Sequence, residues 1–447
     1  MLNIALDKNS HVPLYEQLID YFKKEILSGH LTRHSRLPSV RQLRRELSLS
    51  NTTVNTVYDN LVADGYIISK PRVGYLVADY LPTPAKLPPE LPPRAASSKP
   101  RYDFSNNYVD SQTFNVAAWM RQQNKVIKDP VTLSGYGDVQ GEQILREAIA
   151  TYSYQARGIY ALPEQIVIGA GTQSLLTILL SIWPSLGPKI VALEEPGFPQ
   201  AEETFASHNW QVDYFDAENL PSHLPPLLLV SSSNPYKGRA LTQAAKLSLV
   251  QQAQAQGAYI LEDDYNGEFR YLSETLTSLQ GLAEGKNVIY LGSFSRSLLP
   301  SLRISYMVLP ASLLERYLAK AKLYNQTSST IEQLTLAHYI LHGDLSRHVK
   351  KLRNLYNKKN KILQKALLQI FGSQVTILDY ASGLHLRIAL SYPYTAQEIA
   401  QRAAGVGVIL RPLPDKKNKP AEILLSYAGI DSEDIPQALA KLKQALR

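Results

Sequence analysis

A proline-rich segment divides the 447-residue chain into a short N-terminal part and a long C-terminal part. Residues 81–100, LPTPAKLPPELPPRAASSKP, contain seven prolines and show no apolar periodicity. Proline fixes φ and has no backbone N–H, so this run can continue neither a helix nor a central strand. It favours an extended polyproline conformation of about 3.1 Å per residue, which could separate its ends by roughly 60 Å. The sequence therefore predicts two modules that can reorient.

We place an N-terminal module at residues 1–80, a linker at 81–101 and a C-terminal module at 102–447. A chain of this length is expected to hold two or three domains. No apolar run reaches the roughly 18 residues of a membrane-spanning helix, and the N-terminus lacks the basic-then-apolar order of a signal peptide. We expect a cytoplasmic protein with no membrane partner.

Charge and cysteine content narrow the classes of function. The absence of cysteine excludes disulfides, thiolate metal sites and thiol nucleophiles, and it fits a reducing compartment. No metal site is expected. The net charge of +8 suggests a polyanionic partner. Two segments contain no acid: residues 30–45, with five arginines, and residues 345–378, with eight lysines or arginines.

Three short helical patterns and a hairpin pattern precede the linker. Residues 14–26 place apolar side chains on one helical stripe that ends before Gly29, and residues 40–47 give a second, shorter amphipathic pattern. A third pattern follows Ser50, which stands as an N-cap, with apolar residues at 54, 57, 58 and 61. Two short helices joined by a three-residue turn make a helix-turn-helix. YIIS and YLVA, joined by KPRVG, then predict a two-stranded wing.

This N-terminal sequence resembles the winged helix of the GntR family of bacterial transcription regulators over about residues 10 to 78. The motifs that carry the resemblance are LPSVR and NTTVNTVYDNLVADGY. It implies binding to a double-stranded DNA operator, with a recognition helix in the major groove and the wing near the minor groove. The DNA-contacting residues that it implies are Arg36, Ser39, Arg41, Ser50, Asn51, Thr52, Thr53, Asn55, Arg72 and Gly74.

One position departs from the GntR pattern. Asn51 stands where the family usually has arginine, and arginine reads guanine with two hydrogen bonds whereas asparagine suits adenine. The operator preferences of the family therefore do not carry over at this position.

The C-terminal module alternates short apolar β-rich runs with helical stretches. The runs are QIVIGAG, PKIVALEEP, PLLLVSSSNP, AYILEDDY, NVIYLGSFS and RISYMVLP. This alternation predicts an α/β fold with a largely parallel or mixed sheet covered by helices. Ligands of such sheets bind at the carboxyl ends of the strands, and each chemically suggestive cluster follows one of these runs.

Six clusters in order resemble the signatures of fold-type I aminotransferases: YGDVQGEQILREAIATY, GAGTQSLL, EEPGFPQ, SNPYKG, LEDDYNGEF and SFSRSLLPSLR. With the later GDLSRHVKKLRNLY and SGLHL, nearly the whole chain is similar to the MocR subfamily, in which a GntR winged helix is fused to an aminotransferase-like effector domain. The resemblance implies a fold-type I PLP-transferase domain with large and small subdomains, pyridoxal phosphate as ligand, and a homodimer with sites at its interface.

The ligand site combines one local argument with the resemblance. GAGTQ follows a strand and opens a helix, so the amides near Gly171, Thr172 and Gln173 can meet a phosphate at the positive end of the helix. The resemblance adds Phe198 stacked on the pyridine, Asn234 at the ring hydroxyl, Asp263 rather than Asp264 at the pyridinium nitrogen, Tyr265 at the ring oxygen, Ser293, Ser295 and Arg303 in the phosphate cup, and Tyr136 reaching the phosphate of the neighbouring subunit.

Arg296 stands where the resemblance places the reactive lysine. A covalent link to the cofactor needs an amine that can lose a proton, whereas a guanidinium stays protonated. Transamination is therefore not expected, no catalytic residue is assigned, and Lys237 is a poor substitute. Leu424 stands about where an arginine would hold a substrate carboxylate. Arg387 or Arg411 could serve instead, or could be packing residues.

Three uses of the pocket remain open at this stage. It could bind pyridoxal phosphate without a covalent bond, or bind an amine adduct or another phosphorylated or carboxylated effector with Arg296 as ion-pair donor. Alternatively, Arg296 could pair with Asp263 and fill the cavity, which would leave a structural dimerisation domain without a ligand. The retained anchors favour the first two, so we expect a ligand-responsive, dimeric transcription regulator. The rival is a working aminotransferase with an accessory DNA module. The tract 345–378 is either a further phosphate contact or a solvated helix face.

Overall fold

The computed structural model divides into two compact units, Met1–Ser97 and Ser98–Arg447, each of which is described by itself. The proline-rich segment, Asn234, Lys237 and Tyr265 lie outside the described residues. The structure describes residues 4, 6–7, 10, 12–79, 101–105, 108–110, 112–183, 187–194, 198–231, 241–264, 267–269, 277–379 and 383–447.

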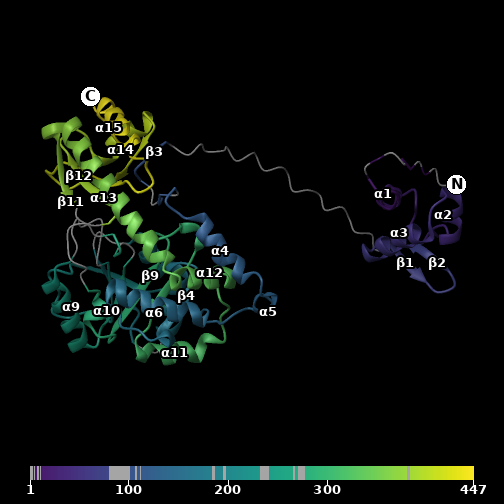
Figure 1. Ribbon diagram of the computed structural model, residues 1–447, viewed down its shortest axis with the longest axis horizontal. Helices are drawn as coiled ribbons and strands as arrows, with labels where there is room; N and C mark the ends of the chain where they lie inside the picture. The colour runs from purple at the N-terminus through teal and green to yellow at the C-terminus, as the bar shows by residue number, and fades with distance from the viewer. Residues whose placement is uncertain are drawn as a thin grey trace. The chain divides into compact units, whose positions relative to one another are not determined.

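The N-terminal unit is a three-helix module with a two-stranded wing (Figure 1). Its elements are α1 (Leu14–Leu27), α2 (Val40–Leu47), α3 (Asn51–Ala63), β1 (Ile67–Lys70) and β2 (Gly74–Val77). The predicted helical stripes meet in one core, in which Phe22, Leu43 and Tyr58 are fully buried. The predicted helices are confirmed, and the wing strands differ from the prediction by one residue at their ends.

A seven-stranded sheet forms the centre of the larger lobe of the C-terminal unit. Its order is β4-β10-β9-β8-β7-β5-β6, and only β10 runs antiparallel to its neighbours. The strands are β4 (Ile166–Gly169), β5 (Ile190–Glu194), β6 (Gln211–Phe215), β7 (Leu227–Val230), β8 (Tyr259–Asp263), β9 (Val288–Ser293) and β10 (Ser305–Val308). The expected mixed α/β sheet is thus confirmed.

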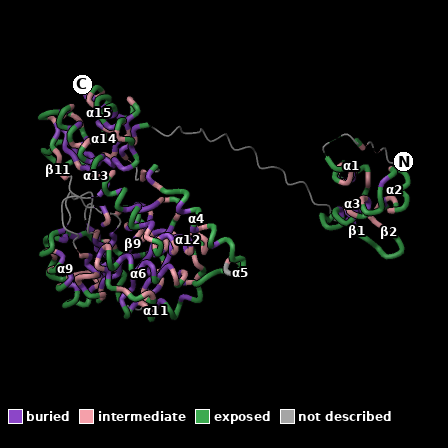
Figure 2. Tube along the Cα trace, in the orientation of Figure 1, coloured by how far each residue is buried: buried purple, intermediate pink, exposed green. Residues whose placement is uncertain are grey.

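Helices cover both faces of this sheet. Successive strand residues point to opposite faces, so Leu261 packs in one core cluster and Ile260 in another. Figure 2 shows buried residues gathered inside the lobe and exposed residues on its outer surface. The covering helices are α4 (Val116–Val126), α6 (Gln143–Arg157), α7 (Thr172–Ile182), α8 (Pro199–Ser207), α9 (Gln243–Gln256), α10 (Leu279–Leu282), α11 (Ala311–Ala321) and α12 (Thr330–Leu341), with a short α5 (Pro130–Leu133).

The smaller lobe holds a four-stranded sheet of order β11-β12-β15-β14. Its elements are β11 (Val375–Asp379), β12 (His385–Leu390), β14 (Arg411–Pro412), β15 (Ala421–Ser426), α14 (Ala396–Gly405) and α15 (Asp434–Ala445). β3 (Tyr102–Asp103) pairs with β13 (Val408–Ile409), so the start of the unit packs with its end. The two lobes are the large and small subdomains that the resemblance implied.

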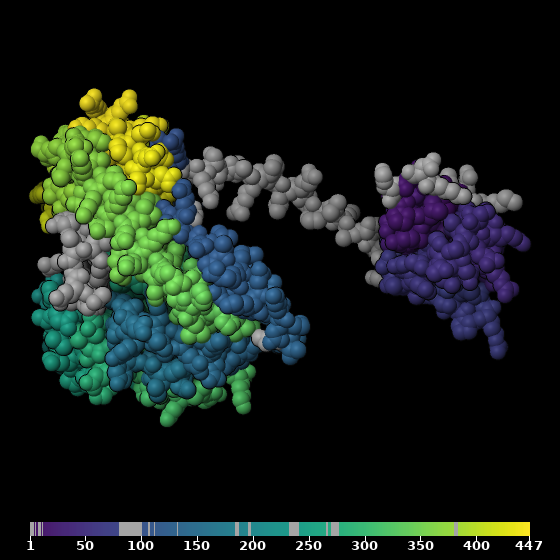
Figure 3. Space-filling view, in the orientation of Figure 1, coloured from purple at the N-terminus to yellow at the C-terminus, as the bar shows by residue number. Residues whose placement is uncertain are grey.

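The long helix α13 (Asp344–Phe371) joins the two lobes. Leu345 and Val349 pack in the core of the large lobe, whereas Leu352 and Phe371 pack in that of the small lobe. Figure 3 shows this helix as a green band across the face in view. Within the described part of the chain, no helix is long and apolar enough to cross a membrane.

Candidate functional sites

The turn between α2 and α3 is fixed by hydrogen bonds of serine side chains. Ser48 ends α2 in the left-handed conformation, with φ of 53°. The Ser50 Oγ accepts a hydrogen bond of 3.0 Å from the backbone N–H of Thr53, and the Ser39 Oγ accepts one of 3.2 Å from Gln42 at the start of α2. Ser39 and Ser50, which the resemblance placed at the DNA, therefore also act as helix N-caps.

The first turn of α3 presents a polar face to solvent. Asn51, Thr52 and Asn55 are exposed, whereas Val54 is fully buried. Thr53 is half-buried, and its hydroxyl lies 2.7 Å from the Ser50 Oγ. The first turn contains no acid, so the positive end of this helix can meet phosphate without a competing carboxylate.

The wing and the segment before α2 form one cationic edge. Arg36 bridges to Leu76 of β2, and a Cβ on Gly74 would lie 3.6 Å from the Arg36 Nε, so the guanidinium lies over this glycine. Gly74 has φ of 105° and Arg72 has φ of 66°. Arg36, Arg41 and Arg72 are all exposed. Exposed guanidinium groups of this kind suit contact with DNA phosphates.

Loss of the Ser50 cap should loosen the recognition helix. Ser50→Ala leaves one N–H of α3 without its partner and should cost about 1 kcal/mol, seen as faster amide hydrogen exchange in α3 of the full-length protein. Ser50→Asp retains an acceptor and should exchange as the wild type does. Equal exchange in the alanine variant and the wild type would show that the cap contributes nothing.

The residues of the implied phosphate cup meet at the ends of three neighbouring strands of the large sheet. Ser305, the first residue of β10, pairs with Gly169 at the end of β4 and with Ser293 at the end of β9. The Ser305 Oγ donates to the Ser293 Oγ at 3.0 Å, which in turn donates to Ser295 at 3.1 Å. Arg303 donates to the Ala170 carbonyl at 2.9 Å. The cup therefore draws on three neighbouring strands.

The glycine at the start of α7 leaves room for the arginine of the cup. Gly171 is the N-cap of α7, has φ of 110° and makes no side-chain cap. A Cβ at Gly171 would collide with the guanidinium of Arg303. Thr172 is half-buried and Gln173 exposed, so the uncapped N–H groups of the first turn remain available to a phosphate.

Three consecutive acids at the end of β8 have three different surroundings. Glu262 accepts hydrogen bonds of 3.0 Å from the backbone N–H groups of Leu279 and Gln280. Asp264 pairs with the Arg157 Nε at 2.6 Å and accepts the Tyr290 hydroxyl at 3.1 Å. Asp263, 7% exposed, has neither a hydrogen bond nor an ion pair among the described residues. Glu262 and Asp264 thus have structural partners, whereas the Asp263 carboxylate has none among the described residues.

The surroundings of Asp263 keep its carboxyl partly protonated near neutral pH. Burial raises its pKa from 3.8 to about 7, and the neighbouring carboxylates of Asp264 and Glu262 add to the shift. Arg296 is not among the charges that act on it. Among the described residues Asp263 forms no ion pair with Arg296, so the structure gives no support to the alternative in which that pair fills the cavity.

This raised pKa should appear in the pH dependence of stability. The folded state keeps a proton on Asp263 that the unfolded chain loses near pH 4, so the free energy of unfolding falls as the pH rises from about 4 to about 7, by at most about 1.4 kcal/mol per pH unit. Asp263→Asn should lack this decrease. Thermal unfolding of the ligand-free wild type and of the ligand-free Asp263→Asn variant measures the difference between their free energies of unfolding. This difference should stay constant above about pH 8. Parallel pH profiles would contradict the raised pKa.

Arg296 lies among groups of the small lobe. It is 6% exposed, on the turn that follows β9. Its charge, with that of Arg411, acts on His385 of β12, and it also acts on Tyr356 of α13. Burial, Arg296 and Arg411 together hold the pKa of His385 well below its usual value. Burial and these two positive charges therefore favour the neutral form of the His385 imidazole.

Two basic residues from the sequence analysis are engaged elsewhere. Arg387 forms an ion pair with Glu422 across β12 and β15, so it does not supply a carboxylate clamp. Lys359 is 2% exposed and donates to Asp110 and to the Ala428 carbonyl, both at 2.8 Å. Within the tract 345–378, Lys359 is therefore neither a phosphate contact nor part of a solvated face, because its ammonium group is buried in an ion pair.

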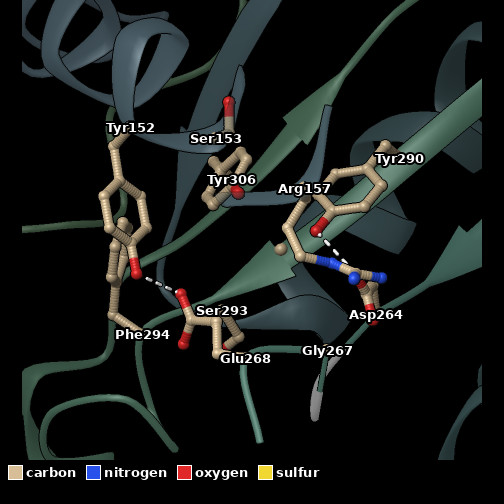
Figure 4. A pocket seen from close by; sticks show the side chains of 11 residues that line it. Tyr152, Ser153, Arg157, Asp264, Gly267, Glu268, Tyr290, Ser293, Phe294 and Tyr306 are labelled. Atoms are coloured by element: carbon tan, nitrogen blue, oxygen red, sulfur yellow. Dashed lines mark hydrogen bonds and ion pairs between the residues drawn. The ribbon is translucent and has the colours of Figure 1, made fainter. Parts of the chain in front are cut away.

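Figure 4 shows a small buried cluster beside Asp264 that sequence patterns did not reveal. Arg157 and Tyr290 point at Asp264, and Tyr152 hydrogen-bonds to Glu268. Water-sized space in this cavity amounts to about 10 Å³, roughly enough for one water molecule. Arg157 and Asp264 lie 107 residues apart in the chain, so no local motif connects them. The cluster fixes the strand end that carries Asp263.

The remaining implied ligand residues have varied surroundings. Phe198 is half-buried and packs against the core cluster that contains the buried leucines of α7. Tyr136 is 91% exposed, as a residue that reaches a neighbouring subunit would be in a single chain. Asn234 and Tyr265 lie outside the described residues.

Comparison with known proteins assigns both units. Residues 14–77 match the gntR family of bacterial regulatory proteins, and residues 104–442 match aminotransferase class I and II. The HTH-type transcriptional regulator YhdI of Bacillus subtilis is 38% identical over 461 residues, covering 98% of this chain and 97% of that protein. The probable rhizopine catabolism regulatory protein MocR of Rhizobium meliloti is 29% identical over 471 residues, covering 99% and 95%.

The C-terminal unit also has solved structural neighbours. The multiple substrate aminotransferase of Thermococcus profundus superposes with a TM-score of 0.68 at 19% identity, covering 78% of this chain and 92% of that one. At this identity the likeness concerns the fold, which is of the pyridoxal-phosphate-binding class. Full-length similarity and both family matches agree. The chain belongs to the MocR-like HTH-type transcriptional regulators, in which a GntR-family DNA-binding module is joined to a class I and II aminotransferase domain.

Proposed function

We propose that the aminotransferase-like domain is a non-catalytic sensor that holds pyridoxal phosphate, or a related phosphorylated or carboxylated effector, without a covalent bond. The observation that carries this proposal is Asp263. Its buried carboxylate ends β8 without a partner among the described residues. A buried charge of this kind is costly unless something pairs with it, and a ring N–H cation would do so.

The neighbouring groups fit the other parts of such a ligand. Asp263 pairs in register with Leu291 of β9, two residues before Ser293 of the cup. The cup, with Arg303, suits a phosphate. Arg296 and Arg411, which both act on His385, suit a carboxylate. When bound, pyridoxal phosphate would supply a cationic pyridine ring, an aldehyde and a phosphate to these strand ends.

The same site supports sensing rather than turnover. Arg296 has no amine that can lose a proton, and Leu424, 1% exposed in β15, carries no charge for a substrate carboxylate. We further propose that residues 81–101 link the two modules, that Tyr136 reaches a second copy in a homodimer, and that ligand binding repositions two winged helices on two operator half-sites.

Calorimetric titration of the full-length protein tests the site. The probes are pyridoxal phosphate and a reduced phosphopyridoxyl–amino acid, which has no aldehyde. Both should bind saturably. Asp263→Asn should weaken binding about 10- to 100-fold, the value of a hydrogen bond to a charged group. Asp213→Asn, an exposed carboxylate on β6 at the other end of the sheet, should bind as the wild type does. No heat from either compound would mean that the pocket is structural only.

A further inference from the structure

The helix α13, which joins the two lobes, carries a cationic face. From residue 345 to its end, this helix contains no acid. Of its eight basic residues, Lys359 is buried, Arg347 pairs with Asp344 at 2.7 Å, and Arg353 donates to the Glu268 carbonyl at 3.0 Å. The other five are exposed and have no ion-pair partner among the described residues: Lys350, Lys351, Lys358, Lys361 and Lys365.

Four of these lysines lie on one side of the helix. The α13 stripe, defined as Lys350, Asn354, Lys358, Lys361 and Lys365, repeats at intervals of four, four, three and four residues, the spacing of helix neighbours. Lys358, Lys361 and Lys365 line, with Asn354 and Asn357, an open groove of about 410 Å³. A lysine face without acids repels itself, so a polyanion laid along it gains from every contact.

We infer that the α13 stripe binds the phosphate backbone of duplex DNA. From Lys350 to Lys365 the helix rises about 22 Å at 1.5 Å per residue. Duplex DNA carries one charge per about 1.7 Å of its axis, so roughly a dozen phosphates pass over that length. The amides of Asn354 and Asn357 are further donors to phosphate oxygens.

Duplex DNA is the polyanion that this chain meets at high local concentration. The inference rests on DNA binding by the GntR module, because a bound winged helix tethers the C-terminal unit near the same duplex. Phosphate contacts carry no sequence information. The stripe therefore strengthens binding to DNA beside the operator without changing which operator is read.

The salt dependence of DNA binding tests the stripe. The probe is a 40-base-pair duplex of mixed sequence, with full-length protein and fluorescence anisotropy at several KCl concentrations. The stripe variant carries Lys350→Gln, Lys358→Gln, Lys361→Gln and Lys365→Gln. The control variant carries Lys189→Gln, Lys322→Gln, Lys417→Gln and Lys419→Gln, four exposed lysines of the same unit. Both lose the same net charge, so only the location differs.

Each lost phosphate contact lowers the slope of log K against log salt by about 0.9. The stripe variant should therefore show a slope smaller by about 2 to 4, and the control variant should keep the wild-type slope. Equal slopes for the two variants would overturn the stripe while leaving DNA binding intact. Failure of the wild-type protein to bind the duplex at all would overturn DNA binding and the stripe together. Matching circular dichroism spectra of the variants exclude misfolding as the cause.

Discussion

Replacement of Arg296 by lysine is expected to turn a non-covalent site into a covalent one. The turn after β9 holds residue 296 buried, next to Ser293 and Ser295 of the cup. A lysine amine in this place would be buried, and burial lowers the pKa of an amine. The neutral amine could then condense with an aldehyde and release water. Both proteins are incubated with pyridoxal phosphate, reduced with borohydride and weighed by intact-mass spectrometry. The variant should carry one adduct per chain, and the wild type should carry none.

The controls for this experiment are two further substitutions. Arg296→Gln has no amine and should stay unmodified while it still binds the compound. Lys237→Ala, added to Arg296→Lys, should leave the adduct in place. A folded Arg296→Lys protein that binds pyridoxal phosphate but gives no adduct would show that residue 296 does not face the aldehyde.

Breaking the buried pair of Arg157 and Asp264 should have the largest effect on stability. Arg157→Met removes the 2.6 Å ion pair and leaves the buried Asp264 carboxylate, which also accepts the Tyr290 hydroxyl, without the Arg157 charge. Removing one partner of a buried ion pair costs about 3 to 5 kcal/mol, mainly because the other charge stays buried. Denaturant unfolding of the C-terminal unit measures this loss.

A double variant separates the charge effect from the packing effect. Arg157→Met with Asp264→Leu removes both charges and should recover a large part of the lost stability. The single variant should also weaken ligand binding, because the cluster fixes the end of β8. A loss below about 1 kcal/mol for Arg157→Met would contradict the structural role of the pair.

Local signals predicted the DNA-binding module almost completely. Its helices follow apolar spacings of three and four residues, and its caps, Ser39 and Ser50, act within three residues along the chain. In the large sheet, six strands coincide with the continuous apolar runs. β6 was missed because it is an edge strand in which only Phe215 is buried, so it lacks such a run.

Contacts between residues that are distant in the chain could not be predicted from sequence patterns. β3 pairs with β13, and Lys359 pairs with Asp110, from which it is 249 residues distant. A lysine in an acid-free tract resembles its exposed neighbours until the fold shows that it is buried. At the ligand site, the resemblance favoured Asp263 over Asp264, and the contacts of Glu262 and Asp264 supply a physical reason for that choice.

The central claim is that this regulator holds a phosphorylated effector without a covalent bond. The measurement that tests it most directly is titration of the wild-type protein with pyridoxal phosphate, followed by borohydride reduction and intact-mass spectrometry. Saturable binding with an unchanged mass is the predicted result. A covalent adduct on the wild-type chain would contradict the claim about Arg296, and the absence of binding by this and the other effector probes would contradict the sensor site itself.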